Sequence, residues 1–434
     1  MDKMADVLGR AGAWCGQNKY LSAIKNAFQN FMPLTIAGAI GVLWCNVLVN
    51  ESTGLGMFFK PIMALDFLNP AFQAVNFCTI SCITVGITLG IAQEIGIWNM
   101  GAERAGYIPG LVGLAAWLSV TNTSHMVDGA KEAFTGIAGN ELGATGLFTG
   151  MIIGVLSVEL FCFFEKQDAL KIKMPEQVPP GVARAFEVLV PATITLIITA
   201  CIGSACYNLT GLYLNDVIKN GIQGPLGAVG ATIPGVMIIY LVIMLFWLVG
   251  IHGNNMLSAV KEALFTPLAL ENVEAFNKHQ TPKNIINMYA LQMWGEFGGS
   301  GVTIGLVIAI MIFSKREDNK AIATLSLVPG LFNINETVTF GIPMVLNPIL
   351  GIPFVFACLV TIIVGYVLTV IGFCPVACLT VPWTCPSLIF GFLATGANIM
   401  GAVTQAILIA ISVVIYTPFL ISYEKYQNKQ AAEA

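Results

Sequence analysis

Charged residues are scarce in this sequence: Asp, Glu, Lys and Arg together make up only 10% of its 434 residues. Soluble domains carry about 25% of such residues, so the composition argues against an ordinary soluble protein. Histidine occurs only three times, and no Lys- or Arg-rich stretch of the kind that binds nucleic acid is present. We therefore expect no nucleic-acid partner.

The sequence also lacks the features of a cleavable signal peptide and of a metal site. The first 30 residues lack a charged region followed by an apolar region and small residues, so we expect the first spanning helix to direct insertion. Most of the eleven cysteines lie in apolar segments, where a thiol packs like a small hydrophobic group. No histidine accompanies Cys374, Cys378 and Cys385, so packing is favoured over metal binding there. We expect no metal and no cofactor, and nothing requires disulfides.

Long apolar runs dominate the rest of the sequence. Hydrophobic residues make up 56% of the chain, and runs of about 20 residues, the length that spans a bilayer, recur throughout. We predict an all-α polytopic membrane protein with about ten transmembrane helices and an N-terminal interfacial helix over residues 1–30. Helices are predicted at 31–50, 74–97, 107–120, 144–164, 186–210, 231–250, 301–314 (a short one), 347–372 and 398–422.

Basic residues favour one orientation, because cytoplasmic segments of membrane proteins are enriched in Lys and Arg. Nine basic residues fall on the side of the N-terminus and three on the other; the nine are Lys3, Arg10, Lys19, Lys25, Arg104, Lys166, Lys171, Lys173 and Arg184, and the three are Lys60, Lys131 and Lys219. The tail also carries Lys425 and Lys429. We therefore predict cytoplasmic termini. Arg184 and Glu187 are expected to form an interfacial ion pair.

The second half of the chain is interrupted more often than the first. Residues 251–300 mix polar and apolar residues and are broken by Gly253, Pro267, Pro282 and a glycine cluster at 298–301; residues 374–397 form another broken stretch. Interrupted hydrophobic segments indicate the binding site of a transporter. We predict that residues 1–210 form a scaffold and oligomer interface, and that residues 211–434 form the transport unit.

One isolated carboxylate, Glu336, is the first candidate for function. The nearest charged residue before it is Lys320, and none follows until Glu424. An ionisable group at membrane depth costs roughly 2.5–3.5 kcal/mol on insertion scales and usually serves a function. Asn333 and Asn335 flank it in a predicted hairpin tip, where irregular backbone must line a cavity or be buried in protein. A polar substrate site is favoured over a structural ion pair or helix cap.

His252 is the second candidate. It follows a predicted spanning helix, Gly250 and Gly253 permit close backbone approach, and Asn254 and Asn255 supply donors and acceptors suited to hydroxyl groups. The alternative is a histidine that only bonds a neighbouring carbonyl. The other two histidines lie in polar loops.

Trp383 and Glu296 complete the candidate set. Trp383 lies between Pro382 and Pro386, where an aromatic face could pack against the C–H face of a pyranose; the alternative is an interfacial tryptophan. Glu296 precedes the glycine cluster and could bond substrate hydroxyls or be an ordinary loop carboxylate.

Three segments together resemble a known family. They are PGLFNINETVTFGIPMVLNP (329–348), IHGN (251–254) and PPGVARAFEVLVP (179–191). Over essentially its whole length the chain resembles the membrane-spanning enzyme IIC component of the bacterial phosphotransferase system, in the lactose/cellobiose/diacetylchitobiose branch. The first segment is long enough to make a chance match implausible.

The resemblance implies a homodimer in the bacterial cell membrane, with two re-entrant hairpins, a dimer contact built by the first five helices and a sugar pocket in the later ones. Glu336 and His252 would lie beside the sugar 6-hydroxyl, and Trp383 would line the pocket. From their own sequence context we add Asn254, Asn335 and Glu296 to the predicted sugar-binding residues. Which of Glu336 and His252 takes the proton is open.

The same resemblance implies the partners. The substrate would be a disaccharide of the cellobiose, diacetylchitobiose or lactose type. A phosphorylated enzyme IIB, supplied through enzyme IIA, would donate phosphate from a phosphocysteine. The sequence ends about twelve residues after the last predicted helix, so we expect enzyme IIB to be a separate chain and phosphorylation to need it. The alternative is an ion-coupled secondary sugar transporter in which Glu336 carries the ion.

Overall fold

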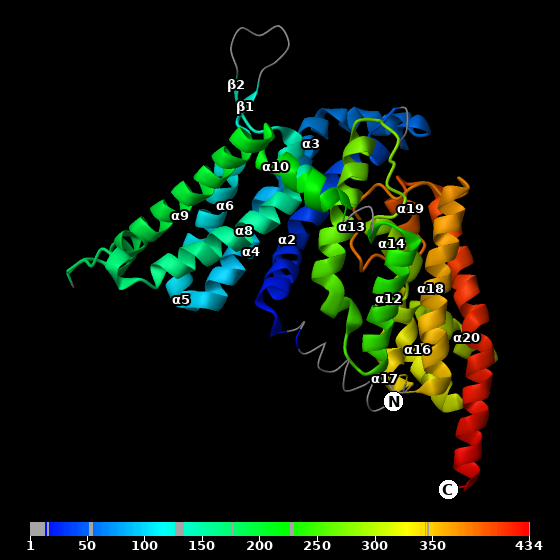
Figure 1. Cartoon of the computed structure of the whole chain (residues 1–434). Helices are drawn as coiled ribbons and strands as arrows, with labels where there is room; N and C mark the ends of the chain where they lie inside the picture. The colour runs from blue at the N-terminus through cyan, green and yellow to red at the C-terminus, as the bar shows by residue number, and fades with distance from the viewer. Residues whose placement is uncertain are drawn as a thin grey trace. The chain divides into compact units, whose positions relative to one another are not determined.

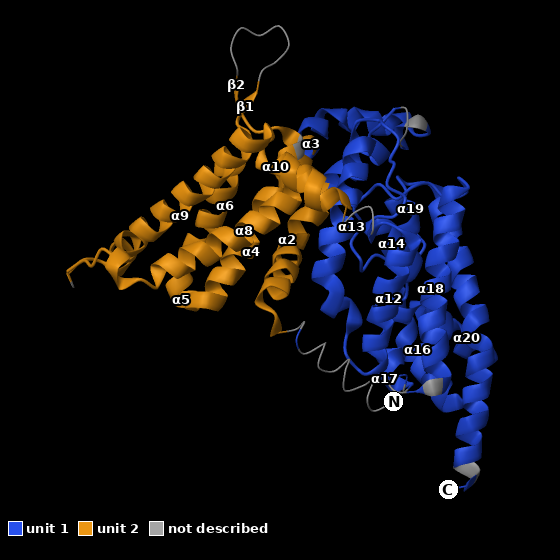
Figure 2. Cartoon of the chain, viewed as in Figure 1, with its two compact units in different colours: residues 1–16, 39–72, 228–434 blue, residues 17–38, 73–227 orange. Residues whose placement is uncertain are grey.

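The computed structural model describes residues 14, 17–51, 55–125, 134–175, 177–225, 230–342, 344 and 347–433. These parts are mostly helical, and their strands form one antiparallel pair, β1 (Ser124–His125) and β2 (Phe134–Thr135). The chain divides into two compact units (Figure 2). Residues 17–38 and 73–227 form unit 2, and residues 1–16, 39–72 and 228–434 form unit 1.

Unit 2 is a bundle of apolar helices. Helix α2 (Lys19–Leu43) contributes its first part, followed by α4 (Ile83–Met100), α6 (Ile108–Val120), α8 (Ala144–Glu165) and α9 (Pro180–Thr210). The shorter elements are α5 (Ala102–Ala105), α7 (Gly139–Leu142), α10 (Leu214–Ile218), 3-10 turns at Ile80–Cys82 and Asp168–Leu170, and a π-helical turn at Lys219–Gln223. Helices α4, α6 and α8 pack against one another, and α9 packs on α6 and α8.

Small residues allow these helices to approach closely. A Cβ added at Gly113 of α6 would collide with Ala92 of α4, and one at Gly150 of α8 would collide with Thr88 of α4. Close packing through small side chains is typical of membrane helices, which cannot rely on the hydrophobic effect for association. A glycine-containing face is therefore part of the packing of unit 2.

A charged network closes one end of the unit 2 bundle. Glu165, at the end of α8, is buried and accepts hydrogen bonds from Arg104 Nε (2.9 Å) and Arg184 Nη1 (2.9 Å). Arg184 Nη1 also lies 2.8 Å from Glu187 Oε2, which confirms the predicted ion pair. The pair is thus part of a larger network, because Arg104 contacts Glu187 as well.

Unit 1 holds the remaining helices (Figure 1). The longer ones are α12 (Ile233–Leu248), α13 (Gly253–Asn277), α15 (Ile304–Phe313), α16 (Glu317–Leu331), α18 (Pro348–Val370) and α20 (Ile399–Glu433). The shorter ones are α14 (Met288–Gly295), α17 (Glu336–Gly341) and α19 (Ile389–Ala394), with 3-10 turns at Leu55–Met57, Lys60–Leu68 and Ser300–Val302 and a π-helical turn at Trp44–Leu48. Helix α3 (Asn69–Cys78) crosses the boundary between the units.

In unit 1, helices α15, α18 and α19 all pack on α20. Helices α12 and α14 pack on α18, and α13 packs on α12 and α14. Helices α16 and α17 form an antiparallel hairpin: a Cβ added at Gly341, the last residue of α17, would lie 2.8 Å from Ile322, near the start of α16. The tip of this hairpin, residues 332–335, leads directly into Glu336.

Six helices in the described parts are long and apolar enough to cross a membrane: Lys19–Leu48, Lys60–Met100, Ala144–Glu165, Pro180–Thr210, Ile349–Val370 and Ile399–Gln430. A seventh candidate is a pair, Met288–Val302 and Ile304–Phe313, bent by 58°. Helices α6 and α12 are apolar but shorter. The chain is thus a predominantly helical polytopic membrane protein, as predicted.

Two sequence predictions need correction. The segment 251–300 has the predicted break at Gly253, where α13 begins, but it is not broken at Pro267, because α13 runs for 25 residues through that proline. A proline inside a helix costs about 3 kcal/mol, but Pro267 and its neighbours Phe265 and Leu270 are buried, so packing outweighs this cost. The predicted boundary near residue 31 is also wrong, because α2 continues through Pro33. Residues 1–13 of the predicted interfacial helix lie outside the described residues.

Candidate functional site

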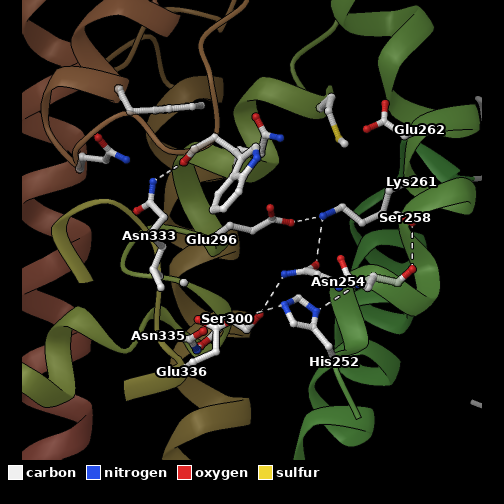
Figure 3. A pocket seen from close by; sticks show the side chains of 18 residues that line it. His252, Asn254, Ser258, Lys261, Glu262, Glu296, Ser300, Asn333, Asn335 and Glu336 are labelled. Carbon is white, nitrogen blue, oxygen red and sulfur yellow. Dashed lines mark hydrogen bonds and ion pairs between the residues drawn. The ribbon is translucent and has the colours of Figure 1, made fainter. Parts of the chain in front are cut away.

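A cavity of about 610 Å³ lies within unit 1 (Figure 3). Its walls come from α13, from α14 and the glycine loop that follows it, from the tip of the α16–α17 hairpin, and from the irregular segment around Trp383. The volume falls in the range of about 300–1,000 Å³ typical of small-molecule sites. Most of the polar side chains that converge on it are amides, hydroxyls and carboxylates.

Helix α13 supplies one wall through helical spacing. Asn254, Ser258 and Lys261 of α13 all line the cavity, and their spacings of three, four and seven residues place them on one face of the helix. His252 is the residue before the helix, and its Nδ1 accepts a hydrogen bond from the main-chain nitrogen of Asn255 (3.2 Å). This bond caps the helix, and it directs the other ring nitrogen, Nε2, away from the cap.

His252 and Glu336 lie close together on the cavity wall (Figure 3). His252 Nε2 lies 3.9 Å from Glu336 Oε1, and both side chains are partly exposed. Because Nδ1 accepts a hydrogen bond, a neutral imidazole carries its proton on Nε2. Among the described residues, His252 is the only basic residue within 4.0 Å of the Glu336 carboxylate. The site therefore offers a donor and an acceptor that a small group could bridge.

Two asparagines fix the hairpin tip that carries Glu336. Asn335 is buried, and its Nδ2 donates to the main-chain oxygen of Ser300 (2.8 Å). Asn333 Oδ1 accepts from the main-chain nitrogen of Gly298 (2.7 Å), and its Nδ2 donates to the main-chain oxygen of Trp383 (2.5 Å). The tip is thus fastened to the glycine loop and to the Trp383 segment.

The glycine loop at 298–301 requires residues without a Cβ. Gly299 has φ +86°, in the left-handed region that favours glycine, and a Cβ there would lie 2.6 Å from Asn335 Cβ. A Cβ at Gly301, with φ +76°, would collide with the Phe354 ring. The hairpin tip packs against this loop at Gly299, and α18 packs against it at Gly301, only because these positions lack side chains.

A buried ion pair lies in the middle of the cavity wall. Lys261 Nζ contacts Glu296 Oε1, and Tyr240 donates its hydroxyl to the same oxygen (2.6 Å). Lys261 Nζ also donates to Asn254 Oδ1 (3.1 Å). Glu296 is therefore not an ordinary loop carboxylate, since it is paired with a lysine and faces the cavity.

Trp383 lines the cavity from an irregular segment between α18 and α19, and its side chain is 45% exposed. Gln405 of α20 supports that segment: its Oε1 accepts from the main-chain nitrogens of Leu388 (2.8 Å) and Gly391 (2.9 Å). Leu388 has φ +75°, a strained conformation for a branched side chain, which these hydrogen bonds help to hold.

The structure places all six residues predicted for the site on one cavity: His252, Asn254, Glu296, Asn335, Glu336 and Trp383. It adds Lys261, Glu262, Gln292 and Gln405, which the sequence reasoning missed. The signal for Lys261 and Glu262 was their helical spacing of seven and eight residues from Asn254, which was obscured when Pro267 was taken as a helix breaker. Nothing in the sequence pointed to Gln292 or Gln405.

The family model "Phosphotransferase system, EIIC" matches residues 25–358. The chain belongs to this family. It is 33% identical to the oligo-beta-mannoside-specific EIIC component of Bacillus subtilis (strain 168), over 98% of this chain and 94% of that protein. It is 29% identical to the cellobiose-specific EIIC component of Lactococcus lactis subsp. lactis (strain IL1403), over 98% of each.

A solved structure supports the same assignment. The transporter ChbC, the IIC component of the N,N'-diacetylchitobiose-specific phosphotransferase system, is 30% identical and aligns with a TM-score of 0.88, covering 97% of each chain. The EIIC family, its membrane location and its role in phosphotransferase sugar transport agree with the sequence prediction.

Proposed function

We propose that this EIIC protein translocates a β-linked disaccharide and presents its 6-hydroxyl group to a phosphorylated enzyme IIB. The proposal for the sugar class is supported by the names of its relatives, which are specific for oligo-β-mannosides, cellobiose and diacetylchitobiose. The cavity also supports the proposal, because its lining is rich in amide and carboxylate groups, which form hydrogen bonds with sugar hydroxyls.

The observation that carries the proposal is the 3.9 Å separation between His252 Nε2 and Glu336 Oε1 in a cavity lined by several amide and carboxylate groups. A hydroxyl group between them would donate to the carboxylate and accept from Nε2–H. Its oxygen would attack the phosphorus of the phosphocysteine, the sulfur–phosphorus bond would break with its electron pair leaving on sulfur, and the proton would pass to Glu336, because Nε2 of His252 already carries a proton and Nδ1 is engaged by Asn255. Such reactions depend mainly on positioning and charge stabilisation.

The other residues have supporting roles in this proposal. The Trp383 ring would pack against the C–H face of a pyranose, and Glu296 would accept hydrogen bonds from hydroxyls further along the cavity. Asn254 and Asn335 are already engaged by Ser300, so they would shape the site around the reacting hydroxyl.

We also propose a membrane arrangement for this function. About ten spans would include the bent pair 288–313 and the α16–α17 hairpin as re-entrant segments, which is supported by their breaks and short helices. Unit 2 would supply the contact of a homodimer, and unit 1 would carry the sugar. Both termini would be cytoplasmic, as the excess of basic residues on that side suggests.

Reconstitution in vesicles tests the proposed reaction. With phosphoenolpyruvate, the soluble carriers and enzymes IIA and IIB, radiolabelled cellobiose should accumulate as its 6-phosphate. Glu336→Gln should lower this rate at least a hundredfold and leave the dimer intact in size-exclusion chromatography, because the amide cannot take the proton. Glu433→Gln, on the exposed C-terminal tail, is the matched control. Accumulation of unphosphorylated sugar on an ion gradient alone would instead support secondary transport.

Binding measurements identify the sugar. Titration with cellobiose, β-mannobiose, diacetylchitobiose and lactose should give one disaccharide with at least tenfold higher affinity than the monosaccharide glucose. Equal affinity for glucose and every disaccharide would contradict a site built for two sugar rings.

A further inference from the structure

Lys261 is the only Lys or Arg among the described residues that line the cavity. Helix α13 places it seven residues after Asn254, and its side chain is only 4% exposed. Its ammonium group contacts Glu296 and Asn254, and the Glu296 oxygen it contacts also receives the Tyr240 hydroxyl. The lysine and the carboxylate thus neutralise each other, and the ammonium has little freedom to move.

This ammonium group determines how the Asn254 amide is oriented. An ammonium can only donate hydrogen bonds, so it must face the amide oxygen, which lies 3.1 Å away. The amide nitrogen then points the other way and donates to Ser300 Oγ (2.9 Å). A serine hydroxyl both donates and accepts, so it would tolerate either end of the amide. Lys261 therefore selects one orientation.

The same hydrogen bonds connect the two sides of the reacting site. Ser300 accepts, through its main-chain oxygen, the Nδ2 donor of Asn335 at 2.8 Å. Asn335 directly precedes Glu336, and Asn254 lies two residues after His252. A continuous path from Lys261 through Asn254 and Ser300 thus joins the helix that carries His252 to the hairpin that carries Glu336 (Figure 3).

We propose that Lys261 is a positioning residue for phosphoryl transfer, which sets the relative position of His252 and Glu336 through Asn254 and Ser300. This role rests on the proposed function. A misplacement of about 1 Å at a reacting centre can slow a reaction about a hundredfold, whereas sugar binding draws on the whole cavity. Loss of the path should therefore slow transfer more than it weakens binding.

The variants must avoid leaving an unpaired buried charge, since that alone can unfold a protein. Lys261→Met combined with Glu296→Gln removes the pair as a unit. Asn254→Ala breaks the hydrogen-bond path at the next residue. A triple variant that combines Lys261→Met, Glu296→Gln and Asn254→Ala tests whether Lys261 and Asn254 act through the same path. Lys261→Arg keeps a group that only donates. Lys278→Met with Glu274→Gln removes an exposed ion pair on the same helix and is the matched control.

The experiment compares the cellobiose Kd without enzyme IIB with the single-turnover transfer rate from phosphorylated enzyme IIB. In the Lys261/Glu296 variant the rate should fall at least tenfold more than the affinity. The triple variant should be no slower than Asn254→Ala, and Lys261→Arg should recover most of the rate. Multiplying effects in the triple variant, or an equal fall in rate and affinity, would overturn the proposal.

A structural readout separates this proposal from the proposed function. If the unaltered protein shows no transfer, the proposed function fails, and a structure of the Lys261/Glu296 variant then decides the positioning role by itself. The His252 Nε2 to Glu336 Oε1 distance should depart from 3.9 Å, and the Asn254 amide should no longer hold the single orientation in which its nitrogen donates to Ser300. An unchanged arrangement of these residues would refute the positioning role.

Discussion

The side chain of Asn333 donates a hydrogen bond to the main-chain oxygen of Trp383 at a distance of 2.5 Å, although the residues are 50 positions apart. The same amide nitrogen donates to the main-chain oxygen of Cys385 (3.0 Å), and the amide oxygen accepts from Gly298 (2.7 Å). Asn333 has φ +64°, a left-handed conformation that asparagine tolerates better than most residues. One side chain thus joins three walls of the cavity.

Asn333→Gly should weaken sugar binding at least tenfold. Glycine keeps the positive φ without strain, so the change isolates the four side-chain hydrogen bonds, which join Asn333 to Gly298, Trp383, Cys385 and Ser387, and each partner left unpaired costs about 1–3 kcal/mol. The Trp383 segment should then lose its fixed position. Calorimetric titration with cellobiose measures the affinity, and thermal unfolding in detergent measures the stability.

His279→Gly is the matched control for this change. His279 also has a positive φ (54°) but lies exposed, outside the cavity lining. It should bind sugar with unchanged affinity. If Asn333→Gly binds as tightly as this control, the hydrogen bonds of Asn333 are not needed to shape the site.

The two nitrogens of His252 can be tested separately. In His252→Asn the amide oxygen can take the place of Nδ1 and cap α13, but nothing replaces Nε2–H at the cavity. In His252→Gln the amide nitrogen can reach toward Glu336, but the cap is lost, at a cost of about 0.5–2 kcal/mol. The asparagine variant should therefore unfold like the unaltered protein and transfer phosphate at least tenfold more slowly.

The glutamine variant should show the opposite pattern, with a lower unfolding temperature and a faster transfer rate than the asparagine variant. Thermal unfolding and single-turnover transfer, measured on the same preparations, decide the question. Equal transfer rates in the two variants would mean that Nε2 has no role in holding the hydroxyl group.

The sequence alone pointed to one end of the cavity, where Glu336 lies. Glu336 stood out because no charged residue lies between Lys320 and Glu424 except itself, and a lone carboxylate in an apolar region is costly. The lengths of the apolar runs likewise located α6, α8 and α12 to within a few residues. Both inferences rest on local properties of the chain, which a sequence shows directly.

The middle of the cavity could not be predicted, because it depends on contacts between distant residues. Lys261 and Glu296 are 35 positions apart, and only the packing of α13 on α14 brings them together. Pro267 was interpreted as a helix breaker, yet α13 continues through this buried residue. Gln405 supports Leu388 and Gly391 from another helix, and its sequence surroundings are those of an ordinary spanning segment.

Gly299→Ala should destabilise the protein by more than 2 kcal/mol and reduce sugar binding. The residue combines φ +86° with a Cβ position only 2.6 Å from Asn335 Cβ, so an alanine meets both backbone strain, of about 1–3 kcal/mol, and a collision with the hairpin tip. Unfolding temperature and cellobiose affinity measure the two effects.

Gly211→Ala is the control for Gly299→Ala, because it introduces backbone strain without a steric collision. Gly211 ends α9 with φ +72°, and a Cβ there would meet no atom within 4 Å. This variant should lose about 1 kcal/mol and bind sugar normally. Equal losses of stability in the two variants would show that the glycine loop does not depend on close approach to Asn335.

The charge network of unit 2 gives a prediction about stability alone. Glu165 is 3% exposed and lies between two guanidinium groups, whereas Glu187 is 28% exposed. Glu165→Gln leaves Arg104 and Arg184 close together without their buried counter-charge, and loss of one partner of a buried pair costs about 3–5 kcal/mol. Because Arg104 is half exposed, water offsets part of this cost, and we expect a loss of about 2 kcal/mol.

Glu187→Gln should lose less than about 1 kcal/mol, as expected for a more exposed pair. Sugar affinity per folded protein should be unchanged in both variants, because every described residue that lines the cavity belongs to unit 1. Thermal unfolding in detergent at low and high salt measures the difference. High salt should reduce the loss of stability caused by Glu187→Gln more than the loss caused by Glu165→Gln, since buried charges are screened less. A larger loss for Glu187→Gln would mean that burial of Glu165 does not govern the network.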